Sequence, residues 1–366
     1  MPASAEQAGL ERWLSRAAAD PAGLPDAGYV ALLGADGTAL ERLCALADAL
    51  RRERVGEEIT FAVNRNLHPE LRFRAPERFS ELLVEAWALG ATEVCIQGPL
   101  SPATPRDGAL QIVAAVREVL PEIHLHAFRP AEFAAAAERL GLTPQRFLER
   151  ARDLGLGSVP GTAARILDDA IRARLSEGTD PPVARWVELI EIAHGVGLAS
   201  TATMVYGHLE TPDHQVAHLR TLAAIQDRTG GFSELILMPI QPEQVPPVLA
   251  GAVRWADARE TRALHAVARL MLSGRIDHLQ APWPKTGLAL AAELLAGGAD
   301  DVGGILLDGT LDPGAGPEAG RSLGLEQLES VAAALGRGLR QRTTLYGDPG
   351  PERREALRRG SPAPLP

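Results

Sequence analysis

Cysteine is nearly absent from the 366-residue chain, which contains only Cys44 and Cys95. Two cysteines form no disulfide framework, and neither has a second thiol at the spacing of a metal site. Aromatic residues are also scarce, at 4% of the sequence, so the core is expected to consist mainly of alanine, leucine and valine. We therefore predict a protein of the reducing cytoplasm without a protein-bound metal.

The sequence also lacks a basic excess and any long hydrophobic run. Its 37 lysines and arginines against 47 acidic residues give a formal net charge of −10, which argues against a nonspecific nucleic-acid binder. No apolar run reaches the roughly 18 residues of a membrane helix, and residues 1–20 do not resemble a signal peptide. No nucleic-acid or membrane partner is expected.

What the sequence does contain, from residue 59 onward, is an alternation of short apolar segments and amphipathic helices. Strands are predicted at residues 59–63, 93–98, 123–128, 155–159, 199–206, 234–239, 275–280 and 301–307. Such alternation predicts βα units and a parallel sheet. About eight units over some ~250 residues predict an α/β protein with a closed (β/α) TIM-type barrel, whose chemistry lies at the C-terminal ends of the strands.

The predicted barrel spans residues 56–347 and carries an extension at each end. Residues 1–55 have helical periodicity and are predicted to form an N-terminal helical cap. Within it, Thr38 and Glu41 have the spacing of a capping box that would start a helix. Residues 348–366 are rich in proline, glycine and arginine, which predicts a flexible C-terminal tail.

Polar residues gather at the predicted strands. Asn64, Arg65 and Asn66 form a predicted polar turn after the first strand. His124 and His126 lie two residues apart on one strand, so both face the same side. They are either hydrogen-bonded interior imidazoles or groups that face a pocket, and the lack of a third ligand nearby disfavours a metal pair.

Three more candidates follow the strand at 199–206. Tyr206, His208 and Glu210 combine a phenol, an imidazole and a carboxylate, which suit acid–base chemistry. They equally suit a polar loop that starts a helix, for which Thr211 is the expected N-cap.

Two further segments also follow predicted strands. Trp283 and Lys285 offer a stacking face and a mobile charge, or a tryptophan that closes the end of the barrel. The glycine-rich turn at residues 155–161 either holds an anion at a helix start or is simply a tight turn.

Taken together, six segments resemble the radical S-adenosylmethionine (SAM) enzymes of the deazaflavin and futalosine type. They are residues 64–66 (NRN), 126–130 (HAFRP), 154–169 (LGLGSVPGTAARILDD), 185–211 (RWVELIEIAHGVGLASTATMVYGHLET), 230–240 (GGFSELILMPI) and 335–347 (LGRGLRQRTTLYG). The second subunit of FO synthase, the CofH type, is most similar, and menaquinone-pathway enzymes (MqnC and MqnE types) are similar too. The resemblance implies a barrel enzyme that joins tyrosine to a ribityl-diaminouracil on the way to coenzyme F420.

The sequence departs from this family where the family binds its cofactors. The family carries a Cys-x3-Cys-x2-Cys motif after NRN, and its thiolates hold a [4Fe–4S] cluster. Here the motif is missing, and His68, Arg72 and Arg74 occupy a shortened segment. We therefore predict that no [4Fe–4S] cluster is bound, because no other side chain would replace three thiolates well.

Two substitutions, in the region that binds SAM in the family, both disfavour SAM binding. Gly98-Pro99 replaces a Gly-Gly pair, and proline removes a backbone donor. Arg165 stands where the family has a glutamate. SAM remains an open candidate ligand that these changes disfavour.

The remaining interior residues match the family. The resemblance implies substrate binding by Asn64, Arg65, Asn66, Gln97, Trp283 and Lys285, and acid–base catalysis by His124, His126, Tyr206, His208 and Glu210. The first hypothesis is a divergent, cluster-less biosynthetic enzyme for a small aromatic or amino-acid-like metabolite. The alternative is a pseudoenzyme, a partner or regulator of an active radical SAM homologue in cofactor or secondary-metabolite biosynthesis. A third is radical chemistry with a borrowed cluster.

Overall fold

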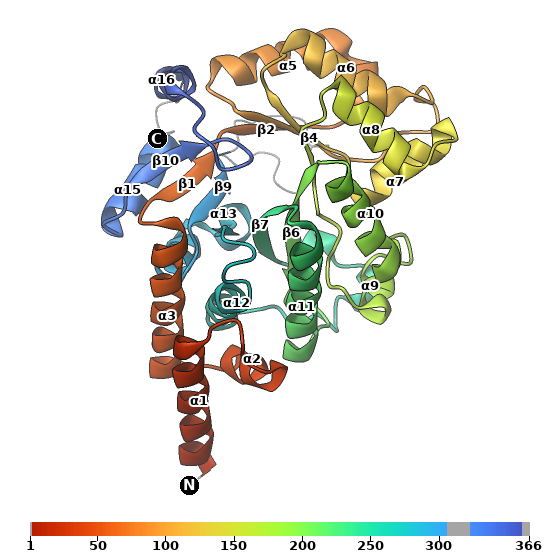
Figure 1. Cartoon of the computed structure of the whole chain (residues 1–366). Helices are drawn as coiled ribbons and strands as arrows, with labels where there is room; N and C mark the ends of the chain where they lie inside the picture. The colour runs from red at the N-terminus through yellow and green to blue at the C-terminus, as the bar shows by residue number, and fades with distance from the viewer. Residues whose placement is uncertain (1, 306–322, 361–366) are drawn as a thin grey trace. The chain divides into compact units, whose positions relative to one another are not determined.

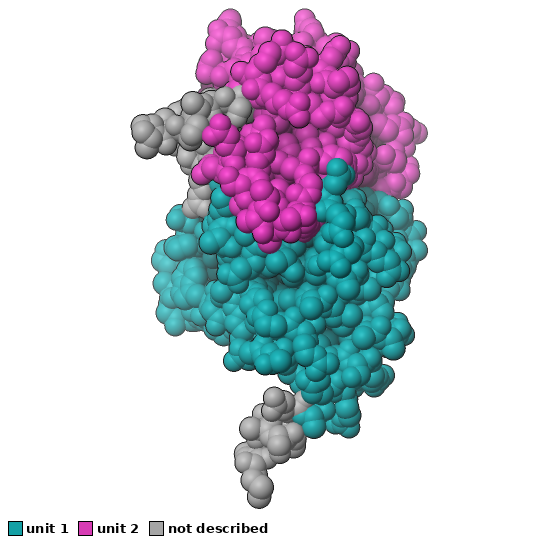
Figure 2. Space-filling view, turned by 90° about the vertical axis from the view of Figure 1, so that its left-hand side faces the viewer, with its two compact units in different colours: residues 1–59, 164–183, 202–301 teal, residues 60–163, 184–201, 302–366 magenta. Residues whose placement is uncertain are grey.

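The computed structural model describes residues 2–305 and 323–360, which divide into two compact units (Figure 2). Unit 1 comprises residues 1–59, 164–183 and 202–301, and unit 2 comprises residues 60–163, 184–201 and 302–366. The end of the last predicted barrel strand, residues 306–307, lies outside the described residues. Three of the five borders, at residues 59/60, 201/202 and 301/302, fall within strands.

The sheet has ten strands in the order β10-β1-β9-β8-β7-β6-β5-β4-β3-β2. The strands are β1 Ile59–Ala62, β2 Asn64–Leu67, β3 Glu93–Ile96, β4 His124–Ala127, β5 Ser158–Val159, β6 Ala199–Tyr206, β7 Phe232–Pro239, β8 Leu279–Gln280, β9 Asp301–Gly304 and β10 Leu339–Arg342. Strands β2, β3, β4 and β5 each pair in parallel with their successor, as do β7 with β8 and β8 with β9. The fold is the predicted (β/α) TIM-type barrel.

The segment at residues 59–67 supplies two strands, where one was predicted. Residues 59–67 were expected to be a strand and then a polar turn, but the chain continues as β2 directly after Val63. β1 pairs beside β9, whereas β2 pairs with β3 at the far end of the strand order. One continuous segment therefore supplies the second strand in this order, β1, and the last, β2. The predicted turn at Asn64-Arg65-Asn66 is wrong, and this changes where their side chains point.

Two predicted strands are reduced to two residues each, and β10, like β2, was not predicted. β5 and β8 are shorter than the apolar segments that predicted them, because neighbouring glycine and polar residues leave the ladder. β10 has the sequence LRQR, which carries no apolar alternation, although Gln341 and Arg342 are buried. Only pairing with β1 makes this segment a strand.

The helices of unit 1 include the predicted N-terminal cap (Figure 1). They are α1 Pro2–Ala19, α2 Asp26–Leu33, α3 Gly37–Val55, α9 Asp169–Leu175, α11 Pro212–Thr229, α12 Ala258–Met271, α13 Trp283–Thr286 and α14 Leu288–Ala296, with short 3-10 turns η1 Pro242–Gln244 and η2 Pro247–Leu249. Helices α2 and α3 pack on α12, which buries their apolar residues. Helix α3 begins at Gly37 after the N-cap Asp36, so the predicted N-cap at Thr38 is wrong by two residues.

The helices of unit 2 cover its strands and include the C-terminal segment. They are α4 Leu71–Arg74, α5 Pro76–Ala88, α6 Gly108–Val119, α7 Pro130–Leu140, α8 Pro144–Leu154, nearly all of α10 Val183–Gly195, α15 Leu325–Ala334 and α16 Pro351–Gly360. Helix α16 corrects the expectation of a flexible tail for this part of residues 348–366. Its Leu357 is buried, and a Cβ at Gly90 would lie 2.6 Å from the Leu357 nitrogen, so a glycine permits this contact.

Within the described part of the chain, no helix combines the length and apolar character that crossing a bilayer would require.

Candidate functional site

Strand register gathers polar side chains on one face of unit 2. Asn64, Glu93 and His124 are partners across β2, β3 and β4, and the next row holds Asn66, Cys95 and His126, followed by Ser158 on β5. Because residues two apart on a strand face the same side, both rows share one face. We call this the polar face of unit 2, formed by Asn64, Asn66, Glu93, Cys95, Gln97, His124, His126 and Ser158.

Arg65 lies on the opposite side of the sheet. Its side chain is 1% exposed, and its Nη1 donates to the carbonyl of Leu82 at 2.7 Å and to Oε2 of Glu85 at 3.0 Å, both on helix α5. This corrects the prediction that Arg65 binds substrate beside Asn64 and Asn66. The guanidinium instead joins the sheet to its covering helix, so the polar face points away from the helices.

The two predicted histidines are joined by a serine that the sequence did not single out. Ser158 Oγ lies 2.7 Å from Nε2 of His124 and 2.6 Å from Nδ1 of His126. Burial lowers the pKa of each imidazole to about 4, and Glu93 partly opposes this for His124. Both rings are therefore neutral at physiological pH.

Two amides complete the polar face. Gln97 Nε2 donates to the sulfur of Cys95 at 2.9 Å, and Thr162 Oγ1 donates to Gln97 Oε1 at 2.9 Å, which fixes the Gln97 amide. Asn64 is 9% exposed, and its Oδ1 has no hydrogen-bond partner among the described residues. A Cβ at Gly304 would lie 2.0 Å from that oxygen, so the Asn64 amide fills the space a side chain there would need.

The segment that replaces the cluster motif is held in place by the hydrogen bonds of Glu70. Glu70 is 7% exposed, and its Oε1 accepts from the backbone nitrogen of Ser101 and from Oγ1 of Thr104, both at 2.7 Å. Burial alone would raise the pKa of this carboxyl, but these two donors and the nearby Arg74 and His68 leave it below its usual range. A buried, hydrogen-bonded carboxylate therefore anchors this segment.

The positions associated with SAM are also engaged. Gly98 donates its N–H to Oε1 of Glu132 at 3.0 Å, and a Cβ at Gly98 would lie 3.0 Å from His68 Nε2. Arg165 forms an ion pair with Asp180. Gly98 and Arg165 therefore already have partners within the protein. Among the other residues of this divergent region, Pro99 and Arg74 are exposed, and Arg72 is half-buried on α4.

The residues present do not fit a [4Fe–4S] cluster. Cys44 lies within helix α3 of unit 1 and Cys95 on β3 of unit 2, so neither belongs to the segment after β2. Among residues 2–305 and 323–360, no three histidine, cysteine or acidic side chains are arranged to hold a metal ion. Three thiolates at one place are required, and the chain has two cysteines in all.

Glu210 organises a buried turn in unit 1. Its carboxylate accepts from the backbone nitrogens of Gly207 at 2.6 Å and His208 at 2.8 Å, and from Nε2 of Gln215 at 3.0 Å. Burial would raise the pKa of Glu210, but the contact with His208 and these donors lower it to about 2. The turn leads into α11, for which Thr211 is the N-cap as predicted.

Tyr206 faces a helix rather than the turn. Its hydroxyl donates to Oγ1 of Thr261 at 3.1 Å, and its ring meets that of His265 edge-on at 6.4 Å, both on α12. Burial raises the pKa of this phenol. Tyr206, His208 and Glu210 thus make the contacts of a polar segment that starts a helix, and their catalytic role stays a prediction.

Trp283 and Lys285 lie on α13 directly after β8. Trp283 is buried and Lys285 half-buried, and both belong to unit 1 together with Tyr206, His208 and Glu210. The predicted site residues therefore form two groups. The polar face of unit 2 contains Asn64, Asn66, Gln97, His124 and His126, so predicted acid–base and binding groups share one face of the sheet there.

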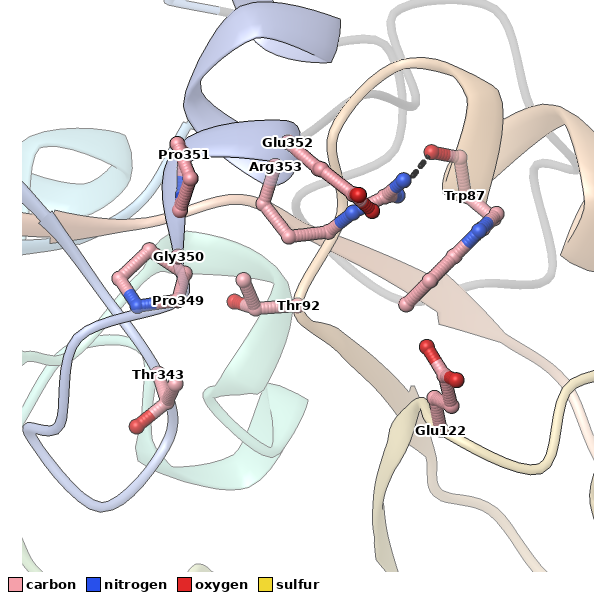
Figure 3. A pocket seen from close by; sticks show the side chains of 9 residues that line it. All are labelled: Trp87, Thr92, Glu122, Thr343, Pro349, Gly350, Pro351, Glu352 and Arg353. Carbon is pink, nitrogen blue, oxygen red and sulfur yellow. Dashed lines mark hydrogen bonds between the residues drawn. The ribbon is translucent and has the colours of Figure 1, made fainter.

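A cavity of about 310 Å³ in unit 2 lies apart from every predicted site residue (Figure 3). It is lined by Trp87, Thr92, Glu122, Thr343, Pro349, Gly350, Pro351, Glu352 and Arg353. Thr92 and Glu122 precede β3 and β4, so the cavity adjoins the N-terminal ends of these strands. Arg353 stacks 3.5 Å from the centre of the Trp87 ring and points toward its carbonyl. Barrel chemistry belongs at the other strand ends.

Sequence reasoning missed Glu93, Cys95, Ser158 and Thr162. The first two were visible as a pattern, because Glu93, Cys95 and Gln97 alternate on a strand that should be apolar on both faces. Nothing local marked Ser158, since it lies 32 residues from His126 and only the pairing of β4 with β5 joins them.

Solved structures define the class of fold. The chain is similar to methylornithine synthase (PylB), with a TM-score of 0.62, 17% identity and coverage of 89% of this chain and 97% of that one. It is also similar to the FeFe-hydrogenase maturase HydG from Carboxydothermus hydrogenoformans, with a TM-score of 0.62, 14% identity and coverage of 94% and 81%. The fold is therefore a (β/α) barrel like that of these two enzymes.

Sequence relatives define the family. The 5-amino-6-(D-ribitylamino)uracil–L-tyrosine 4-hydroxyphenyl transferase of Archaeoglobus fulgidus is 38% identical over 317 residues, covering 82% of this chain and 92% of that protein. The chain belongs to the family of this transferase, which confirms the resemblance to the CofH type.

Longer relatives match as well. FO synthases of Nocardia farcinica and Mycobacterium leprae are 43% and 44% identical, over 91% of this chain and 41% of their own length. The chain thus spans about two fifths of these FO synthases. No protein-family model matches the sequence.

Proposed function

We propose that this chain is a divergent biosynthetic enzyme of the family that acts without a [4Fe–4S] cluster. The proposal rests on two neighbouring features of unit 2, the segment after β2 and the polar face. The segment after β2 holds no cysteine and is anchored by Glu70, while the neighbouring polar face keeps two imidazoles, a carboxylate and three amides. Buried polar groups are costly unless they are paired, and here they are gathered on one face.

The ligand is a small aromatic or amino-acid-like metabolite. The transferase of Archaeoglobus fulgidus is named for L-tyrosine and 5-amino-6-(D-ribitylamino)uracil, and both molecules carry donors and acceptors that the amides of Asn66 and Gln97 can meet. His126 supplies the acid–base group, because a neutral imidazole can take or give a proton at its second nitrogen. SAM is the less favoured ligand, since Gly98 and Arg165 already have protein partners.

The alternative is a non-catalytic partner or regulator of an active radical SAM homologue. The observation behind it is the missing cluster motif, because a chain without three thiolates needs an active homologue, as a separate chain, to supply radical chemistry. This alternative predicts co-purification with such a chain and no turnover by the isolated protein.

Binding is tested by calorimetry and native mass spectrometry on the purified chain, titrated separately with L-tyrosine, the ribitylaminouracil and SAM. We expect one of the first two to bind, and Asn66→Ala to weaken it roughly three- to tenfold through one lost hydrogen bond. The matched control is Arg65→Met, the adjacent residue on the helix side, which should leave the affinity unchanged. Binding of neither metabolite, or equal loss in both variants, would contradict the proposal.

The cluster is tested separately by anaerobic reconstitution with iron and sulfide. We expect no stable protein-bound iron and no visible absorption of a cluster, because three thiolates are absent. Stoichiometric iron that persists through gel filtration, and disappears in a Cys95→Ser variant, would overturn the cluster-less assignment.

A further inference from the structure

Three side chains from adjacent strands form a continuous hydrogen-bonded chain in unit 2. Ser158 Oγ on β5 lies within 2.7 Å of His124 Nε2 and 2.6 Å of His126 Nδ1 on β4. Ser158 is 1% and His126 is 7% exposed, whereas His124 at the start of β4 is half-buried. The chain therefore runs from a partly accessible imidazole to an enclosed one.

Proton counting couples the two imidazoles. A serine hydroxyl has one proton to donate, so it donates to one ring and accepts from the other. If His126 Nδ1 donates to Oγ, then Oγ donates to His124 Nε2, and both rings carry their proton on Nδ1. If His124 Nε2 donates instead, both rings carry it on Nε2. The two tautomers thus match in either state.

The surroundings favour neutral rings at both ends. Burial dominates, and Arg342 acts in the same direction on His126. Around His124, Glu93 favours the charged form while His126 and Arg117 oppose it. An isolated buried imidazole that accepted a proton would become an imidazolium, which this environment penalises.

We infer that His124, Ser158 and His126 form a proton relay that lets His126 accept or release a proton without retaining a charge. When a proton arrives at His126 Nε2, the Nδ1 proton moves to Ser158 Oγ and the hydroxyl proton moves to His124 Nε2. His124 then releases its Nδ1 proton toward solvent or Glu93. One proton enters and one leaves, and the reverse sequence delivers a proton. The inference rests on the proposed acid–base use of His126.

The chain offers a matched control. His194 Nε2 lies 2.8 Å from Ser200 Oγ, also in unit 2, and burial lowers the pKa of His194 to about 4. His194 is not one of the two rings whose tautomers the relay couples. Ser200→Ala therefore removes a histidine–serine bond without affecting a relay.

The test is ¹⁵N NMR of the histidine rings in the full chain, with His124→Gln and His126→Gln for assignment among the nine histidines. We expect equal tautomer populations at His124 and His126 in the native protein. Ser158→Ala should separate the two populations, Ser158→Thr should restore the match, and Ser200→Ala should leave it intact. Opposite tautomers at the two rings of the native protein would overturn the relay even if no serine variant folds.

A second readout separates the relay from the proposed function. With turnover of a bound metabolite, Ser158→Ala should lower kcat by about tenfold or more, within the range of acid–base contributions, and shift the pH profile while the ligand affinity is kept. Unchanged kcat and pH profile would overturn the relay. Failure of any metabolite to bind, with matched tautomers still observed, would count against the proposed function and not against the relay.

Discussion

At the scale of single residues, the alternation along β2 decides which side chains face the site. Asn64 and Asn66 lie on the polar face of unit 2, and Arg65 between them reaches helix α5. The three residues are consecutive in the sequence, and a turn would have allowed their three side chains to face one environment. A strand cannot, because consecutive residues point to opposite sides.

Arg65 is therefore expected to matter for stability. Replacing it by methionine removes the bonds of a buried charged group to Leu82 O and Glu85, which should lower the free energy of unfolding by about 1–3 kcal/mol. Urea denaturation measures the change. Arg78→Met on the same helix is the control, because Arg78 and Glu81 are 50% and 64% exposed and such pairs contribute little. Equal effects of the two variants would contradict this role.

At the scale of elements, hydrogen bonds hold the segment from β2 to α4 in place. His68 Nδ1 accepts from the Glu70 nitrogen at 3.2 Å, and Glu70 reaches the segment after β3 through Ser101 and Thr104. The sequence predicted a shortened segment without thiolates. It did not predict that a carboxylate would anchor it, because the two donors lie more than 30 residues further along the chain.

Removing that carboxylate should loosen both segments. Glu70→Ala leaves the Ser101 nitrogen and the Thr104 hydroxyl without their acceptor and is expected to cost about 1–3 kcal/mol. Hydrogen exchange followed by mass spectrometry should show faster exchange in residues 67–75 and 98–105. Glu81→Ala, an exposed acid on α5, serves as control. Protection that stays unchanged in Glu70→Ala would show that other contacts hold the loop.

At the scale of the whole molecule, neutral buried histidines are spread over both units. Burial lowers the pKa of His124, His126, His194 and His265 to about 4 and that of His218 to about 3. In the unfolded chain their pKa returns to roughly 6.5, so the unfolded state binds more protons between these values. The folded state is then favoured above pH ~6.5 and loses this advantage as the pH falls toward about 4.

Stability should therefore decline on acidification before the carboxylates titrate. The free energy of unfolding is expected to fall by several kcal/mol between pH 7.5 and 5, at roughly 1.4 kcal/mol per pKa unit for each histidine. Urea midpoints at both pH values measure it. The window lies above the range in which Glu210 and Asp300, whose pKa values are lowered, contribute. His218→Gln should flatten the dependence, and a constant midpoint in the native protein would contradict the account.

The sequence by itself determined the family, the (β/α) barrel and the lack of three thiolates after β2. These follow from residue identity and local spacing, which six segments and two cysteines display without any folding. Only the tertiary structure decided that Arg65 leaves the site, that Glu70 anchors the shortened segment and that Ser158 joins two histidines. Each of these features depends on strand register or on contacts between segments that are distant in the sequence. These contacts stabilise the protein only once the whole sheet has formed.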